Sequence, residues 1–256
     1  MSSNRSSSFW RWLGAAVLLY AVFMVLTVPA ATIVRRLQPH GIAMADVTGT
    51  VWNGHASAVQ AKGITFGPTR WRIRPLSLLL GRLTVELNAR RDDGYVDAVV
   101  AARLSGRVRV TDLRAALPIA TFNSLGIAGN WQGSLQAQIP ELVIDKGWPT
   151  VAQGSVEAHD LVGPARQPAA IGSYRVEFER NASPENANEL RGQLTSLQDA
   201  PLDVTGVLRL LPNRQYVIDA QVATRTNAPA SINRALQYLG APDARGRRSL
   251  SIAGSF

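Results

Sequence analysis

The stretch YVDAVVAARLSGRVRVTDL, residues Tyr95–Leu113, decides the fold class. Small or apolar residues alternate with polar ones on each side of Ser105-Gly106. A period of two is typical of a strand that covers one face, and a Ser-Gly pair between two such runs is typical of a turn. The stretch therefore predicts two antiparallel strands joined by a short connection.

The same alternation recurs along much of the chain. In SYRVEFER (Ser173–Arg180) the apolar residues fall on one face and the charged residues on the other. Three later runs alternate in the same way: Leu202–Leu211, Tyr216–Arg225 and Ser249–Phe256. Turn residues punctuate the runs, as in Arg91–Gly94 and Leu211–Arg214. Short strands broken in this way predict a large antiparallel sheet, either curved in one layer or arranged in two layers.

The segment GTVWNGHA (Gly49–Ala56) could form a catalytic loop or a hairpin, and its pattern favours the hairpin. Asn53-Gly54 supplies the positive φ angles that a two-residue type I′ turn needs. Trp52 is then expected to be the last strand residue before the turn, with its ring over the end of the hairpin.

Two short helices are predicted. The first is DLRAAL (Asp112–Leu117), which Thr111 or Asp112 would cap and Pro118 would end. The second is APASINRALQYLG (Ala228–Gly240), which Asn227 would cap. Its apolar face would carry Ile232, Leu236 and Leu239. RPLSLLLGRL (Arg74–Leu83) has too short an apolar core to cross a membrane, and we expect a buried strand or helical turn there.

The N-terminal region contains a candidate membrane span. Residues Leu13–Val34 include no Asp, Glu, Lys or Arg, and about 20 apolar residues in a helix cross a bilayer. Trp10 and Trp12 precede this stretch, where indole rings favour the headgroup level. Val28-Pro29-Ala30 resembles a signal-peptide cleavage site, so a cleaved signal is the alternative.

We therefore predict a mainly β protein, in which an N-terminal transmembrane helix precedes a large curved antiparallel sheet or two-layer β domain with two short helices. Residues 1–12 would form a cytoplasmic tail, residues 13–34 a transmembrane signal-anchor helix, and residues 37–256 a periplasmic β-rich domain. The short tail and the long following region favour this orientation.

Composition and motifs point away from several kinds of chemistry. The 256 residues include no cysteine, which excludes disulfides, thiolate metal sites and cysteine nucleophiles. The formal net charge is +9, but the sequence contains no run of five or six basic residues, which argues against nucleic acid as a partner. The three histidines form no HExxH or HxH motif, and GxSxG, P-loop and GxGxxG motifs are absent. We therefore expect no enzyme, no cofactor and no metal.

Two charged clusters have a functional and a structural interpretation. Asp92, Asp93 and Asp97 resemble part of a calcium loop, but Leu104 stands where an EF-hand would place its bidentate glutamate. A hairpin turn with solvated carboxylates is the favoured interpretation. Arg245, Arg247 and Arg248 surround Gly246 and could grip a phosphate or a lipid headgroup, although such clusters are more often solvated loops.

Three segments carry a resemblance to a known family. They are VTGTVWNGHA (Val47–Ala56) after the apolar N-terminal stretch, RWRIRPLSLLLGRL (Arg70–Leu83) and LQYLGAPDARGRRSLSIAGSF (Leu236–Phe256). In their order and spacing they resemble protein N of the bacterial type II secretion system, also called the general secretion pathway. The resemblance covers nearly the whole chain and includes VTDLRAALP (Val110–Pro118) and GQLTSLQDAPLDVTGVLRLL (Gly192–Leu211).

The resemblance implies a bacterial inner-membrane protein with a cytoplasmic N-terminus, a single span and a periplasmic bulk. It implies an accessory or scaffold role in export of folded proteins across the outer membrane, with other secretion-system subunits and inner-membrane lipid as partners. It carries no catalytic residues. The partner-binding candidates are Trp52, Trp71, Trp131, Arg245, Arg247 and Arg248, of which the tryptophans are expected to lie mostly in the core.

A lipid-binding or lipid-transfer protein is the alternative function. A long sheet with one apolar face makes a groove that shields acyl chains if no helix or loop of the chain fills it. The sequence leaves open the partner subunits, the exported substrates, the oligomeric state and whether the sheet closes on itself.

Overall fold

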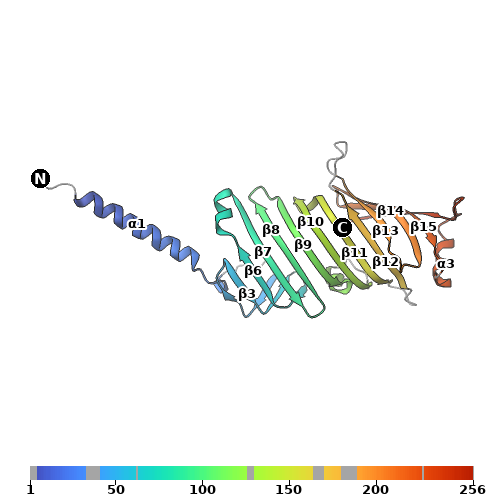
Figure 1. The fold of residues 1–256 in the computed structure, drawn as a ribbon, viewed down its shortest axis with the longest axis horizontal. Helices are drawn as coiled ribbons and strands as arrows, with labels where there is room; N and C mark the ends of the chain where they lie inside the picture. The colour runs from blue at the N-terminus through green and yellow to red at the C-terminus, as the bar shows by residue number, and fades with distance from the viewer. Residues whose placement is uncertain are drawn as a thin grey trace.

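The computed structural model describes residues 5–32, 41–61, 63–125, 130–163, 170–179, 189–226 and 228–255. The described chain is mainly β, with helix α1 (Arg5–Leu26) projecting from one end of a long sheet and α3 (Ala230–Gln237) at the other end (Figure 1). The expected antiparallel sheet with few helices is confirmed.

Thirteen of the described strands form one sheet in the order β16-β15-β14-β13-β12-β11-β10-β9-β8-β7-β6-β3-β2. Their bounds are β2 (Thr48–Gly49), β3 (Asn53–Ala56), β6 (Thr69–Ile73), β7 (Arg82–Arg91), β8 (Gly94–Arg103), β9 (Val108–Pro118), β10 (Gln132–Asp145), β11 (Trp148–Val162), β12 (Ala170–Phe178), β13 (Leu190–Ser196), β14 (Leu202–Leu211), β15 (Gln215–Thr224) and β16 (Arg248–Ser255). A smaller sheet contains β1 (Ile42–Ala45), β4 (Ala58–Ala61) and β5 (Ile64–Phe66). Two 3-10 helices in the described residues, η2 (Pro75–Leu80) and η3 (Ile119–Leu125), join strands.

The large sheet is a meander. From β6 to β16, each strand pairs antiparallel with its neighbours along the chain. Antiparallel neighbours need only short connections, which the turn residues of the sequence supply. The turns predicted at Ser105-Gly106, Arg91–Gly94 and Leu211–Arg214 all join neighbouring strands, so these predictions are confirmed.

The register gives the sheet one apolar face and one polar face. Each strand from β6 to β16 contributes to the apolar face through the following residues: Ile73, Val85, Val100, Val110, Leu142, Val156, Val176, Leu194, Leu208, Ile218 and Ile252. The polar face carries cross-strand ion pairs, among them Arg74–Glu86, Arg90–Asp97, Arg175–Glu157 and Arg209–Asp219. Exposed ion pairs contribute little to stability, but they keep this face polar.

The C-terminal end of the apolar face is covered by α3. Leu236 of α3 is buried with Val204, Ala220 and Val222 of β14 and β15, and Leu239 packs against the same cluster. The helix and its apolar face are therefore confirmed. Asn227, expected to cap it, lies outside the described residues; the N-cap position is occupied by Pro229, without a side-chain cap.

The protein exposes much more surface than a compact domain. Its accessible surface is 17024 Å², whereas a compact protein of 27.6 kDa exposes about 11,000 Å². Most side chains of the large sheet are half-buried. The sheet is a single layer over most of its length, so few of its side chains are enclosed by a second layer. The sheet therefore leaves wide surfaces for other molecules.

The helix predicted at Asp112–Leu117 is wrong, because these residues belong to strand β9. The polar pair Thr111-Asp112 marks a β-bulge and not a helix cap. The register with β8 shifts between Asp97 and Val99, and Asp112 takes a left-handed φ of 52°. Asp tolerates this conformation better than most residues, and the bulge restores the apolar alternation from Leu113 onward.

The hairpin predicted in Gly49–Ala56 is present, but its turn lies earlier in the chain. Thr48 pairs with His55 and Gly49 with Gly54, so Asn53-Gly54 belongs to β3. Thr50 N–H donates to the Asn53 carbonyl at 3.0 Å, which closes the turn across Val51 and Trp52. Gly49, with a φ of 86°, supplies the positive angle at the strand end.

Within the described part of the chain, no helix has both the length and the apolar character needed to cross a membrane. The span predicted at residues 13–34 is therefore not confirmed. The helix itself ends at Leu26, and residues 33 and 34 lie outside the described residues.

Candidate interaction surfaces

The junction between α1 and the large sheet is built around two tryptophans. The indole N–H of Trp52 donates to the Val25 carbonyl at 2.8 Å. Val25 is in the last turn of α1, where carbonyls lack partners within the helix. The indole N–H of Trp71 donates to the Val51 carbonyl at 3.0 Å. Both rings are half-buried, so these side chains fix the chain entry to the sheet.

The chain after α1 also covers one edge of the sheet. Ala30 N–H donates to the Gly49 carbonyl at 3.1 Å, and Val51 N–H donates to the Val28 carbonyl at 3.0 Å. These bonds run along the outer side of β2, which is the terminal strand of the sheet. The backbone groups of this edge are therefore partly occupied by the chain itself.

The remaining predicted site residues lie elsewhere. Trp131 precedes β10 and is half-buried beside Gly163. The arginines precede or begin β16, ten strand positions from Trp71 on β6, which corresponds to roughly 50 Å at the usual strand spacing. The structure thus brings Trp52 close to Trp71, but it does not bring the tryptophans and arginines into one site.

The arginine loop before β16 is organised by Asp243. Its Oδ1 accepts hydrogen bonds from the backbone N–H groups of Arg247 and Arg245, each at 2.8 Å. These two hydrogen bonds lower the pKa of the Asp243 carboxyl, and the bond from Arg247 has the larger effect. Arg247 reaches Asp203 at 3.3 Å, and Arg248 donates to the Gly240 carbonyl. Two of the three arginine side chains are thus engaged within the chain, and the exposed third is Arg245.

Strand β16 forms the other edge of the sheet. It pairs with β15 on one side, and no described strand pairs with it on the other. Its only charged residue is Arg248, it contains no proline, and Ile252 is 42% exposed. Ser251 donates to Asp219 at 2.7 Å and helps to lower the pKa of that carboxyl. Natural sheets usually protect such edges with charges, proline or bulges, and this edge has little of that protection.

A third surface was missed by the sequence analysis. The leucines of η2 were expected to be buried, but Leu76 is 76% exposed and Leu80 is 70% exposed. The helical turn itself is present because Ser77 lies inside it, where its hydroxyl donates to the Arg74 carbonyl at 2.6 Å and accepts from Thr84 N–H at 3.2 Å. A polar residue takes the buried position, so the leucines point outward.

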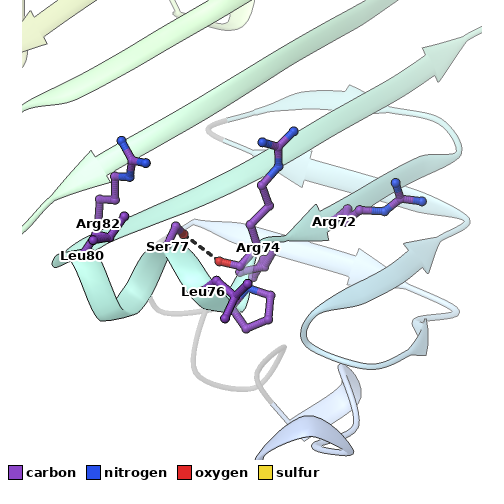
Figure 2. A pocket seen from close by; sticks show the side chains of 8 residues that line it. Arg72, Arg74, Leu76, Ser77, Leu80 and Arg82 are labelled. Carbon is purple, nitrogen blue, oxygen red and sulfur yellow. Dashed lines mark hydrogen bonds between the residues drawn. The ribbon is translucent and has the colours of Figure 1, made fainter.

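The exposed turn borders a shallow groove of about 450 Å³ (Figure 2). The groove is lined by Arg72, Ile73, Arg74, Pro75, Leu76, Ser77, Leu80 and Arg82. The sequence shows a leucine run between Arg74 and Arg82. It does not show that these leucines are exposed, because their exposure depends on Ser77 taking the side of the helical turn that faces the protein.

The other titratable clusters have structural partners. Asp93 contacts Arg91 at 2.6 Å, and Asp97 contacts Arg90 at 2.6 Å, so the acids near the β7–β8 turn form ion pairs with arginines. Hydrogen bonds from Arg90 are the main cause of a lowered pKa for Asp97. His159 lies 3.0 Å from Glu157. The described residues include no group of three or more His, Cys, Asp or Glu side chains suited to hold a metal ion. The hairpin turn is present at Asp92 and Asp93, which are exposed, but Asp97 lies within β8 and is half-buried in an ion pair, not solvated.

Comparison with known proteins identifies the family. Residues 40–251 match the family described as Type II secretion system (T2SS), protein N. The chain is 26% identical over 257 residues to Type II secretion system protein N of Vibrio cholerae serotype O1, covering 95% of this chain and 98% of the relative. It is 25% identical over 250 residues to Type II secretion system protein N of Aeromonas hydrophila, covering 92% and 94% of the two chains. No solved structure matches significantly. Since the family match spans most of the sequence and nearly all of the large sheet, the chain belongs to the type II secretion system protein N family.

Proposed function

We propose that this chain is a non-enzymatic scaffold component of the type II secretion apparatus that supports export of folded proteins across the outer membrane. Membership of the protein N family supports a place in that apparatus. The observation that carries the scaffold role is the weakly protected edge strand β16. Its partners would be other subunits of the apparatus.

Strand β16 suits a partner that adds a strand to the sheet. An edge strand offers a row of backbone N–H and C=O groups, which supply affinity to an incoming strand. Its apolar side chains Leu250 and Ile252 continue the apolar face of β15. A partner strand that paired with β16 would therefore extend this apolar face by one strand. Arg245, exposed beside this edge, is the most accessible of the six predicted partner-binding residues. Contacts through Trp52, Trp71, Trp131, Arg247 and Arg248, all half-buried, also belong to this proposal.

An inner-membrane anchor is the second part of the proposal. Residues 13–34 would cross the bilayer, with residues 1–12 in the cytoplasm and residues 37–256 in the periplasm. The apolar side chains of α1 support this, because Leu19 is 74% exposed and Phe23 is 63% exposed. A helix surface this apolar is stable only when something covers it, and hydrocarbon would do so. The alternative is a signal peptide cleaved near Ala30.

Photo-crosslinking in living cells tests the scaffold role. A crosslinking amino acid would replace Ser249 on the edge strand or Thr195 on the central strand β13. Both positions are exposed and lie on the polar face, so they differ mainly in access to the edge. We expect adducts with secretion-system subunits from residue 249 and few from residue 195. Equal yields from both positions, or none from residue 249 in a secreting strain, would overturn the edge assignment.

Lipid binding is a second candidate function, favoured by the continuous apolar face. That face crosses every strand from β6 to β16, and between β7 and β12 most of its side chains are only half-buried. At the C-terminal end, however, α3 covers β14 and β15, which leaves less of the face open to an acyl chain. Native mass spectrometry of the full chain released from detergent would decide. Retained phospholipid in a fixed stoichiometry would favour this function over the scaffold.

A further inference from the structure

Exposed leucines and cationic side chains gather along one rim of the large sheet. The exposed leucines are Leu76 and Leu80 of η2 and Leu104 of the β8–β9 turn, which is 98% exposed. Arg82, which begins β7, pairs with Arg103, which ends β8, so η2 and the β8–β9 turn lie at the same ends of two neighbouring strands. We call this surface the leucine–arginine rim and define it by Leu76, Leu80, Leu104, Arg82, Arg103 and Arg107.

The charge of the rim is strongly positive. Arg103 directly precedes Leu104, Arg82 follows Leu80 by two residues and Arg107 follows Leu104 by three, and all three arginines are exposed. Arg82 and Arg103 stand opposite each other on neighbouring strands, an arrangement that repels in the isolated protein. Arg72 and Arg74 on the groove side share Glu86, and Arg107 lies 3.5 Å from Asp145. Lys146, in the adjoining β10–β11 turn, adds another exposed cation.

This combination indicates an anionic bilayer surface as the occupant. Leucine side chains at a turn tip can enter the boundary between headgroups and acyl chains, while arginines bind lipid phosphates around them. Arginine also keeps its charged end in water while its stem lies on apolar surface. Repulsion between Arg82 and Arg103 would be relieved by phosphate groups placed between them.

The position of the rim agrees with this occupant. Helix α1 reaches the sheet next to β2 and β3, through the bond between Trp52 and Val25. Strand β7 is only two strand positions from β3 in the sheet. In Figure 1, η2, drawn in teal before β7, lies at the same end of the sheet as the C-terminal end of α1. A membrane entered by α1 would therefore face this end of the domain.

We propose that the leucine–arginine rim contacts the anionic lipid surface of the membrane that α1 enters, and so fixes how the β domain stands on the bilayer. The proposal rests on the anchor proposed above, and adds to it a second attachment made by the folded domain itself.

The test uses the full chain in vesicles with an environment-sensitive fluorophore. Because the sequence contains no cysteine, Leu104→Cys gives one labelled position. Asp92→Cys is the matched control, since it lies in the turn at the opposite end of the β7–β8 hairpin, about 30 Å away along ten strand residues. Val17→Cys reports on α1. Vesicles would contain phosphatidylcholine alone or phosphatidylcholine with phosphatidylglycerol, and circular dichroism would confirm that each variant folds.

We expect the label at residue 104 to shift to shorter wavelength and to resist aqueous iodide in phosphatidylglycerol vesicles, while the label at residue 92 stays in water. Substituting both Arg82→Gln and Arg103→Gln should lower the fraction in contact with lipid, by up to about fivefold per charge removed. High salt should also lower the fraction in contact with lipid, because it screens the attraction between the arginines and the lipid phosphates.

The other outcomes separate the two proposals. A label at residue 104 that stays in water in both vesicles, with residue 17 in the bilayer, would overturn the rim contact and leave the anchor standing. Labels at residues 104 and 17 both in water would overturn the anchor as well. A label at residue 104 that is shielded only in native membranes with the assembled apparatus would assign the rim to a protein partner and overturn the lipid contact.

Discussion

The ring of Trp71 lies directly against the backbone of Gly54 on the neighbouring strand. A Cβ placed on Gly54 would stand 2.2 Å from Cζ2 of Trp71, closer than any real contact. The same indole donates its N–H to the Val51 carbonyl at 3.0 Å, so the ring is fixed at both its polar and its apolar side. The junction beside α1 therefore depends on a glycine at position 54, for packing and not for a turn.

Gly54→Ala should destabilise the β3–β6 junction. The added methyl group forces the Trp71 ring to move, and overpacking of this kind costs about 1–3 kcal/mol. Thermal unfolding followed by circular dichroism would measure the loss. Gly14→Ala is the control, since nothing lies within 4 Å of its added Cβ and alanine favours a helix. Equal stability of the two variants would show that the ring does not hold this junction.

Ser173→Ala should destabilise the β12–β14 region. Ser173 is 1% exposed. Its hydroxyl donates to Asp199 at 2.5 Å and accepts from Asp160 N–H at 3.1 Å. Removing it leaves a half-buried donor and a carboxylate without this partner, which costs about 1–3 kcal/mol. Ser105→Ala, in the exposed β8–β9 turn, should change the free energy of unfolding by less than about 0.5 kcal/mol.

Most of the sheet could be predicted because its evidence is local. Alternation in Tyr95–Leu113 and Ser173–Arg180 follows from the two-residue period of a strand, and Ile232, Leu236 and Leu239 follow from the period of a helix. The errors came where the backbone departs from its ideal form. Asp112 has the residue type of a helix cap but occupies a bulge. Asn53-Gly54 has the residue types of a type I′ turn, but Gly54 lies in β3, where it pairs with Gly49 and Trp71.

The interaction surfaces were harder to predict because they depend on contacts between distant segments. The sequence predicted Trp52 and Trp71 as contact residues. Their hydrogen bonds to the Val25 and Val51 carbonyls could not be predicted, because they depend on how α1 and the β2–β3 turn pack against the sheet. The exposure of Leu76 depends on the burial of Ser77 beneath it. The outer edge of β16 depends on the order of strands in the sheet, which alternation does not specify.

Alkaline unfolding should depend on Tyr174. Burial raises the pKa of Tyr174 to about 12 from an ordinary value of 10.0, and its hydroxyl donates to the Ile171 carbonyl at 2.8 Å. The unfolded chain releases this proton near pH 10 while the folded chain keeps it, so the stabilisation is full below pH 10 and is lost as the pH rises toward 12.

Tyr174→Phe should therefore flatten the fall in stability between pH 10 and pH 12, at the cost of one hydrogen bond, about 1 kcal/mol, at neutral pH. Chemical denaturation at several pH values measures both effects. Tyr238→Phe is the control, because Tyr238 is 91% exposed. An unchanged slope in the Tyr174 variant would contradict the burial of this hydroxyl.

The proposed anchor should be sensitive to a charge in α1. Leu19→Arg places a cation in the middle of the apolar stretch, which costs about 3 kcal/mol on membrane-insertion scales. We expect the variant to leave the membrane fraction after carbonate extraction, while Leu19→Phe stays in it. Retention of both variants would argue against a span at residues 13–34, and loss of residues 1–30 from the mature chain would establish a cleaved signal.

Ser249→Lys should weaken partner binding at the β16 edge without affecting the fold. Position 249 is exposed and pairs with Gln221 on one side only, so a lysine there is accommodated in the free protein and the free energy of unfolding should change by less than about 0.5 kcal/mol. A strand added to this edge would enclose the charge, and lysine is a common means of blocking such pairing. We expect co-purification of secretion-system subunits to fall by about tenfold, equivalent to roughly 1.4 kcal/mol of association free energy.

Thr195→Lys, on the central strand β13, makes the same chemical change where no edge is open and should leave co-purification intact. If both variants bind subunits as the unmodified chain does, the partner must contact a surface other than the β16 edge.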